Sequence, residues 1–561
     1  MTDNVTPGLK NPEQISIPIV VGVTGHRFLH PDQIPIIKEK VRQQLQKLIV
    51  NYAHSPVVMI NSLAEGADQL CAEVALELGI PLIAPLPLAQ KDYETDFSNE
   101  ARTVFYDQCS KAAELFVVSP FEEYEEITRD FCYRQAGIYL AKHCHVLLAL
   151  WNGSEPKPGG CGTAEVVDMK LNATYTEKDS NNFKTNDGAA VMHFLSIRNT
   201  DDVTQKEITV SLLENVPGAL DAVLTKTENF NQLSKTGQFN NQYPLIAQNI
   251  LEESGQNNQR LHTLYQHSDQ LSVSFRDKYI ASIKWLSFFG VSLVVVFLLY
   301  DELESNIFLY LYWLVLLISG IVLSNIKKNQ WHEKYLESRA LAESLRVQFY
   351  LRVSGINHCV SDDFTWSQKK EVVWVERAMD ALTAFPNITL SFPEENIKTE
   401  WITDQYNYHR TKADSTGKQH IINDRISSAM LYTSLLTFAV IFILEISSPD
   451  ILAMPVFPEW VNRILLVHAG QQFIIRGIFK IALGLFAAVT LFLSNYYGKL
   501  SLDHKCSDHK KLAGLYQTAL TKWDIQHLDK KKLLLDLARE EITENGVWLA
   551  YNRDNRPTLD F

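Results

Sequence analysis

Several features common in other classes of protein are missing from this sequence of 561 residues. Its seven cysteines show neither CxxC pairs nor zinc-ligand spacing, which favours reduced thiols in a cytosolic environment. The net charge of −13 comes without a basic stripe that could replace phosphate counterions, so we expect no nucleic-acid partner. Residues 1–14 are polar and contain no apolar core, which predicts no signal peptide ahead of the first strand.

Charge is also absent from Ile307–Ile326, a run of twenty residues without Asp, Glu, Lys, Arg or His. A helix of that length rises about 30 Å, the thickness of the hydrocarbon layer of a bilayer. In lipid the backbone polar groups have to bond within the segment, so a helix is the expected form. The alternative, a buried helix of a soluble core, would normally be shorter and would have a polar face.

We predict four transmembrane helices, at residues 279–300, 307–326, 426–446 and 473–497. They form two hairpins, each preceded and followed by a polar helical stretch, so one plan occurs twice. Basic residues flank both hairpins, whereas the loop 301–306 has three acids and no base. The positive-inside rule therefore places both termini and all soluble parts in the cytosol. The flanking bases are Arg276, Lys278, Lys284, Lys327, Lys328, Lys334, Arg410, Lys412, Lys418, Arg425, Lys499, Lys505, Lys510 and Lys511.

Residues 17–198 alternate short apolar segments with helical stretches. This alternation is typical of an α/β fold with a parallel sheet covered by helices on both faces. Ligands of such sheets bind at the carboxyl ends of the strands. The predicted strands lie within residues 17–27, 57–61, 81–86, 115–118, 146–150 and 191–199.

The pattern divides the chain into five parts. These parts are a nucleotide-binding domain (1–200), a connector (201–260), a first helix–hairpin–helix unit (261–360), a linker or insertion (361–400) and a second such unit (401–561).

Three loops that contain glycine follow three of the predicted strands. Glycine lets backbone N–H groups approach a phosphate closely, and a helix N-terminus adds a favourable dipole and unbonded donors. Each loop alone is a weak signal, because a tight turn also requires glycine, but three at one end of a sheet indicate a ligand site. The candidate ligand-binding residues are Thr24, Gly25, His26 and Arg27; Ser62, Leu63, Ala64, Glu65, Gly66 and Asp68; and Gly159, Gly160, Cys161, Gly162, Thr163 and Glu165.

Arg134 is a further candidate, as a second contact to phosphate or ribose, and a solvated helix arginine is an equal alternative. We expect His26 to donate a hydrogen bond rather than act as a base. No loop fits a Walker A pattern and no GxGxxG follows the first strand, which disfavours an ATPase or a dinucleotide dehydrogenase. The His, Cys and Asp residues within 504–509 have no known metal-site spacing, so we predict neither a metal nor a cofactor.

The motifs GVTGHR, SLAEGADQLCAEVALELGIPLIAPLPL and PGGCGT closely resemble the SLOG superfamily over residues 17–198. This Rossmann-like group contains the DNA-processing SMF proteins, the LONELY GUY phosphoribohydrolases and ligand sensors of bacterial defence systems. The resemblance implies that the loops bind a nucleotide or a nucleotide-derived messenger. LONELY GUY enzymes carry PGGxGTxxE with a catalytic Glu, whereas here Glu165 falls two residues after Thr163 and Val166 takes the third place. This departure favours a sensor without catalytic residues.

The second half resembles the SLATT group of two-transmembrane effectors, which accompany SLOG domains in antiphage defence of the Thoeris and CBASS types. The resemblance is carried by the flanked hairpins and by the terminal stretch EITENGVWLAYNRDNRP. Such effectors are thought to form pores or to perturb membranes. The resemblance therefore implies a multi-pass protein of the bacterial inner membrane.

Together these observations suggest a cytosolic sensor fused to a four-helix membrane effector. An ADP-ribose-like or cyclic-nucleotide signal, made by an enzyme encoded nearby, would bind at the three loops. The helical stalks would pass the change to the hairpins, which would form a pore or disrupt the membrane in antiviral defence. Four helices of this polarity scarcely enclose a channel, so we expect a homo-oligomer.

Two other functions stay open. One is a membrane-tethered hydrolase of nucleotides or NAD-like substrates, with Glu165 or Glu65 as its acid–base group. The other is a passive membrane scaffold that binds a protein partner and no nucleotide.

Overall fold

The computed structural model describes residues 15–118, 127–157, 160–173, 175, 187–198, 208–237, 239, 244–303, 305–385, 392–446, 480–490, 492–493 and 501–554. They belong to two compact units. Unit 1 comprises Met1–Gln270, Glu337–Ile397 and Asp529–Ala550, and unit 2 comprises Leu271–Leu336, Lys398–Leu528 and Tyr551–Phe561. Each predicted hairpin thus lies in a segment that leaves unit 1 and returns to it.

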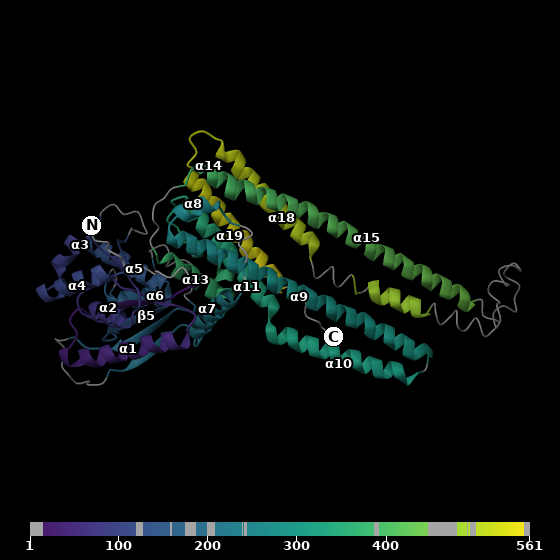
Figure 1. Cartoon of the computed structure of the whole chain (residues 1–561), viewed down its shortest axis with the longest axis horizontal. Helices are drawn as coiled ribbons and strands as arrows, with labels where there is room; N and C mark the ends of the chain where they lie inside the picture. The colour runs from purple at the N-terminus through teal and green to yellow at the C-terminus, as the bar shows by residue number, and fades with distance from the viewer. Residues whose placement is uncertain are drawn as a thin grey trace, which may run out of the picture. The chain divides into compact units, whose positions relative to one another are not determined.

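Unit 1 is built on a seven-stranded sheet in the order β4-β3-β2-β1-β5-β6-β7. Figure 1 labels β5 of this sheet among the purple and blue helices. Strands β1 to β6 are parallel, as the alternation of strands and helices predicts. Most of them are short apolar runs buried on both faces, the usual pattern of a parallel sheet between helices. The strands are β1 (Ile19–Gly25), β2 (Val57–Ile60), β3 (Leu82–Leu86), β4 (Glu114–Val117), β5 (Val146–Trp151), β6 (Ala190–Leu195) and β7 (Val210–Glu214).

The strand order reverses at β1, which pairs with β2 on one side and with β5 on the other. Gly22 lies opposite Ile60 of β2 and Leu147 of β5. In doubly wound sheets such a reversal separates two neighbouring loops at the carboxyl ends of the strands, where ligands bind. The loops after β1 and β5, two of the three predicted ligand loops, stand at this switch point.

The last strand differs from the prediction, because the expected connector 201–260 supplies both β7 and a long helix. β7 runs antiparallel to β6, with Ala190 opposite Glu214, so the sheet is mostly rather than wholly parallel. Its sequence VSLLE is only half-buried at the sheet edge. A short edge strand of this kind lacks the continuous apolar run that marks the inner strands.

Helices cover both faces of the sheet. Val21 and Val23 of β1 belong to one core with α1, α2, α4 and α7, whereas Val20 belongs to a second core with α5, α6 and α13. Successive side chains of a strand point to opposite faces, so the two cores lie on the two sides of the sheet. The helices are α1 (Ile34–Asn51), α2 (Ala67–Glu77), α3 (Gln90–Tyr93), α4 (Asn99–Lys111), α5 (Arg129–His143), α6 (Thr163–Asn172), α7 (Ala219–Thr236), α8 (Gln248–Glu253), α12 (Trp366–Glu371) and α13 (Val373–Thr383).

Longer helices link the sheet-bearing unit to the apolar segments. The exit helices of both predicted hairpins meet in unit 1, where Arg346 of α11 forms a buried ion pair with Glu541 of α19. Short helices precede α12 and α15: η4 (Val360–Asp363), α14 (Glu394–Ile397) and the π-helical η5 (Lys398–Thr403). The long helices are α9 (Gln256–Leu303), α10 (Asn306–Asn329), α11 (Trp331–Val353), α15 (Asp404–Ile446), α18 (Leu502–Trp523) and α19 (Lys530–Asp554).

Three helical stretches of the described chain are long and apolar enough to cross a membrane. Gln256–Asp301 and Asn306–Val353 contain the predicted spans 279–300 and 307–326, and Glu394–Ile443 contains the predicted span 426–446 as far as Ile443. The fourth predicted span, 473–497, lies partly outside the described residues, and within it Lys480–Thr490 is a shorter apolar helix. The chain is therefore a membrane protein by the length and composition of these helices.

The buried Asn231 of α7 provides a test of how the segment 201–260, which the sequence predicts to be a connector, is bound to the sheet. Its side-chain amide accepts a hydrogen bond from the Ile17 N–H (2.8 Å) and donates to the Ile17 carbonyl (2.9 Å). Asn231→Ala leaves both backbone groups without these partners, so we expect a loss of about 3 kcal/mol of stability. Thermal unfolding of the detergent-solubilised protein, followed by tryptophan fluorescence, measures the change.

The neighbouring, exposed Gln232 supplies the matched control. Gln232→Ala should leave the unfolding midpoint within error of the parent protein. Equal shifts for the two variants would contradict the anchoring role of Asn231.

Candidate functional site

The first two predicted loops touch through their backbones. A side chain at Gly25 would come within 2.8 Å of the Leu150 carbonyl oxygen and would overlap Ala67. Gly66 has a φ of +95°, and a side chain there would collide with the carbonyl oxygen of Arg27. The Ala67 N–H donates to the His26 carbonyl (3.1 Å). These two glycines are therefore required by close packing of the loops.

His26 is buried and bridges the loops after β1 and β5. Its Nε2 accepts a hydrogen bond from the Asn152 N–H (3.0 Å), and its Nδ1 lies 3.4 Å from Nε of Arg198. Asn152 and Arg198 follow β5 and β6, so the imidazole joins the ends of three strands. Sequence reasoning missed both partners, because neither belongs to a recognisable motif.

Arg27 and Glu65 form an ion pair between the first and second loops, with Nε and Oε2 3.6 Å apart. Arg27 also donates to the Asp96 carbonyl oxygen, and Glu65 accepts from the Ser98 hydroxyl (2.7 Å) at the start of α4. The Arg27 side chain is 43% exposed, which leaves part of the guanidinium open to solvent.

The remaining residues of the second loop turn into the fold. The Ser62 hydroxyl donates to the Pro85 carbonyl (2.9 Å), and the buried Leu63 takes a φ of +60°. Asp68, in the first turn of α2, is buried and accepts a hydrogen bond from the Ala64 N–H. Burial outweighs this bond and raises the pKa of Asp68 to about 7. Thr24, in β1, is also buried.

The third loop ends at the start of α6, where Gly162 is the N-cap residue without a side-chain cap. The Glu165 carboxylate folds back and accepts a hydrogen bond from the Lys157 N–H (2.6 Å). A side chain at Gly160 would overlap this carboxylate, and one at Gly162 would come within 3.0 Å of it. Cys161 and Thr163 are half-buried in the same turn, and Gly159 lies outside the described residues.

Arg134 lies in α5, on the helix whose neighbour α6 begins at the third loop. Asp130 and Gly137 share its helix face by their spacing. A side chain at Gly137 would come within 2.8 Å of Val166 of α6, and burial together with the Asp130 charge raises the pKa of Cys161. Arg134 is half-buried, and no carboxylate of the described chain pairs with it.

The structure thus gathers the predicted residues in two groups. The first two loops form one contacting group, and Gly160, Gly162 and Glu165 of the third loop form a second group, whereas Arg134 forms no hydrogen bond or ion pair with the described residues of either. His26 and Asn152 connect the two groups across the sheet's switch point.

A polar cluster beside the first group escaped sequence analysis. Arg129 pairs with Asp96 (2.8 Å), and the Tyr133 hydroxyl donates to the same carboxylate. Burial alone would raise the pKa of Asp96, but these two hydrogen bonds outweigh it and lower the pKa. Asp96 lies far from α5 in sequence, so no local pattern could reveal the contact.

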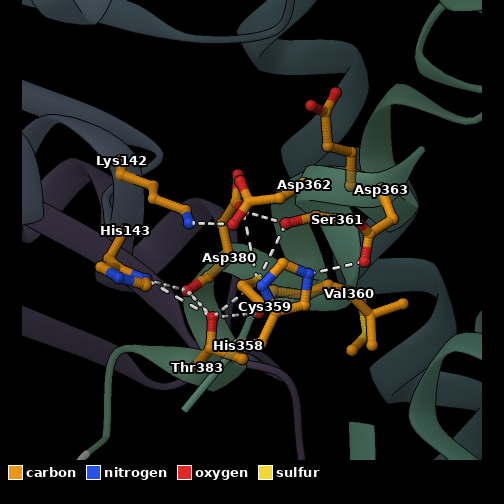
Figure 2. A network of polar contacts seen from close by, with 12 residues as sticks. Lys142, His143, His358, Cys359, Val360, Ser361, Asp362, Asp363, Asp380 and Thr383 are labelled. Atoms are coloured by element: carbon orange, nitrogen blue, oxygen red, sulfur yellow. Dashed lines mark hydrogen bonds and ion pairs between the residues drawn. The ribbon is translucent and has the colours of Figure 1, made fainter. Parts of the chain in front are cut away.

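The other end of α5 enters a buried network with the segment 358–383, shown in Figure 2. Lys142 Nζ lies 2.6 Å from an oxygen of Asp362, and His143 Nδ1 lies 2.7 Å from the Asp380 carbonyl oxygen. The Ser361 hydroxyl donates to the Asp380 carboxylate (2.6 Å). The network therefore fastens the end of α5 to the segment that separates the two hairpins.

The protonation states in this network suit an anchor rather than a catalyst. Burial, assisted by the Lys142 charge, lowers the pKa of His143 to about 3. Burial raises the pKa of Cys359 to about 11, although its Sγ lies 2.9 Å from Oγ of Ser361. At neutral pH the imidazole is uncharged and the sulfur stays a thiol, which is a poor nucleophile.

Among the described residues, no three His, Cys, Asp or Glu side chains could hold a metal ion together. The histidines of 504–509, where we predict no metal site, have separate contacts in unit 2. His504 pairs with Asp508 (2.8 Å), whereas His509 Nδ1 lies 2.9 Å from Nδ1 of His409 in α15.

Comparison with models of protein families finds no match to this sequence, and comparison with curated proteins finds none either. The resemblance to the SLOG and SLATT groups therefore stays a prediction from the motifs.

The buried ion pair of Figure 2 gives a stability prediction. Lys142→Met leaves Asp362 without its cation, so we expect a loss of about 2 kcal/mol, measured as the thermal unfolding midpoint in detergent. Lys111→Met breaks an exposed pair of the same length, Lys111–Asp107 at 2.6 Å, and should cost about 0.5 kcal/mol or less. Similar losses for both variants would refute the anchoring role.

Asp68 gives a prediction about pH. Its pKa in the fold, about 7, exceeds the ordinary value of 3.8, so the folded protein holds the proton more tightly than the unfolded chain. The contribution of Asp68 to stability is therefore greatest below pH 3.8 and falls as the pH rises to about 7. Asp68→Asn removes this dependence and should raise the unfolding midpoint more at about pH 8 than at about pH 5.

Asp92→Asn, which changes an exposed carboxylate on α3, is the control and should shift the midpoint equally at both pH values. A pH-independent effect of Asp68→Asn would show that Asp68 is charged in the fold at neutral pH.

Proposed function

We propose that this protein is a membrane effector that binds a nucleotide-derived second messenger through its sheet domain and responds by permeabilising the membrane. The observation that carries the proposal is the position of α5. One end of this helix lies near the third loop, where the charge of Asp130 acts on Cys161, and the other end is fastened to the segment between the hairpins. A ligand at the loop would therefore act on a helix that is bound at its other end to the segment between the hairpins.

The chemistry of the loops favours a ligand that carries both phosphate and sugar. Arg134 and the exposed part of Arg27 supply positive charge, and the start of α6 supplies backbone donors without a side-chain cap. The Glu165 carboxylate repels phosphate but accepts hydrogen bonds, which suits a ribose hydroxyl. An ADP-ribose-like or cyclic-nucleotide messenger presents both kinds of group.

The covalent chain connects the buried network around Asp362 to the hairpins. The segment that holds Asp362 and Asp380 continues through η5 into α15, and the exit helices α11 and α19 meet at Arg346 and Glu541. To switch nearly all molecules, a ligand has to favour the active arrangement by roughly 5 kcal/mol. Assembly of several copies would help to supply this energy and would provide enough helices for a pore.

The proposal places the protein in the bacterial inner membrane with both termini in the cytosol. A separate enzyme, encoded nearby, would make the messenger during infection. The fourth span would complete the second hairpin.

The hydrolase alternative has less support from the contacts of its two candidate acids. Glu65 is held by Arg27 and Ser98, and Glu165 by the Lys157 N–H. These contacts use carboxylate oxygens that a general acid–base group would have to present to its substrate.

Reconstituted protein tests the proposed function directly. Full-length protein in dye-filled liposomes should release dye on addition of an ADP-ribose-like or cyclic nucleotide, and not before. Arg134→Ala removes a charge-assisted contact, so the nucleotide concentration for half-maximal release should rise about tenfold or more. Lys47→Ala removes an exposed charge from α1 and should leave this concentration unchanged.

Two outcomes count against the proposal. Release that proceeds equally without nucleotide, in parent and Arg134→Ala alike, would mean that the sheet domain does not control the membrane helices. Nucleotide breakdown that Glu165→Gln abolishes would favour the hydrolase.

A further inference from the structure

A set of cations gathers where the apolar helices of unit 2 meet their polar continuations. We call this set the basic belt, and all its members are exposed. The belt consists of Arg276, Lys278 and Lys284 of α9, Lys327 and Lys328 of α10, and Lys334 of α11.

The hairpin geometry brings the two sides of the belt to one level. Phe275 and Lys334 lie equally far, about 28 residues, from the ends of α9 and α10 that the loop joins, which corresponds to about 42 Å of helix. A bilayer with its headgroups is about 40–45 Å thick. With the loop at one membrane surface, the outer part of the belt therefore reaches the headgroups of the other surface.

A side-chain contact joins the two sides. The ammonium groups of Lys278 and Lys334, from α9 and α11, lie 5.7 and 5.9 Å from the ring centroid of the buried Phe275. Like charges on two helices repel each other, and the ring face compensates them only in part. The pair leaves two converging ammonium groups open to the outside.

Carboxylates do not neutralise the belt. Arg276 pairs with the adjacent Asp277 (2.9 Å), and the five lysines have no ion pair among the described residues. α18 adds Lys505 to the same positive region, because burial and then the charge of Arg276 lower the pKa of Lys505. The positive potential at this level is therefore built by several helices of unit 2.

We propose that the basic belt binds the phosphate groups of anionic phospholipids in the cytosolic leaflet. A lipid offers the phosphate beside hydrocarbon, which matches lysines that stand directly above apolar, exposed side chains such as Trp285. Free phosphate would be held at such exposed lysines only by weak, salt-screened attraction. The belt thereby fixes the depth of the first hairpin and its preference among lipids, independently of the messenger.

Native mass spectrometry of the full chain in a neutral detergent tests this inference, with phosphatidylglycerol or phosphatidylcholine added. The parent protein should retain phosphatidylglycerol at about a tenfold lower lipid concentration than phosphatidylcholine. Lys278→Gln with Lys334→Gln should remove most of this preference without changing retention of phosphatidylcholine. Lys522→Gln with Lys532→Gln removes the same charge from exposed positions outside the belt and should leave the preference intact.

A second belt variant combines Lys327→Gln with Lys328→Gln and keeps both contacts to Phe275. It is used if the first belt variant does not fold, and it should also weaken the preference for phosphatidylglycerol. Equal retention of the two lipids by the parent protein would overturn the proposal, as would a full preference in both belt variants. Displacement of phosphatidylglycerol by an equal concentration of inorganic phosphate would also overturn it, since the belt would then bind free phosphate.

Discussion

The burial of one lysine constrains the architecture of unit 1. Lys142 at the end of α5 is withdrawn from water, and Asp362 at 2.6 Å provides its main compensation. Separating the pair would leave a buried charge unpaired, which is strongly unfavourable. The end of α5 and the segment around Asp362 are therefore held together, and the sheet carries on one face a piece of chain from between the two hairpins.

The same helix reaches the candidate ligand site at its other end. α5 has 15 residues and is about 22 Å long, with Asp130 near Cys161 of the third loop and Lys142 in the buried network. Its packing on α6 is so close that Gly137 has no room for a side chain. A sensor needs an element that contacts both the ligand site and the output segment. α5 is such an element, because it packs on α6 and pairs with Asp362 at one end.

Composition and pattern predicted much of this molecule. β1 and β5 were predictable because they are continuous apolar runs, and three of the membrane-length helices because they lack charge over long stretches. The pairing of Lys142 with Asp362, 220 residues away, was not predictable, because a lysine on a helix normally faces water. Loop positions followed from strand ends, but the contact of Gly66 with Arg27 depends on tertiary packing. β7 escaped because a short, half-buried edge strand resembles a loop in sequence.

The central claim is that ligand at the loops and the segment between the hairpins communicate through α5. Hydrogen–deuterium exchange of the full-length protein in lipid nanodiscs, with and without an activating nucleotide, tests this claim most directly. The account predicts slower exchange at residues 160–166 together with changed exchange across 358–383. Protection confined to the loops, with exchange across 358–383 unaltered, would contradict it.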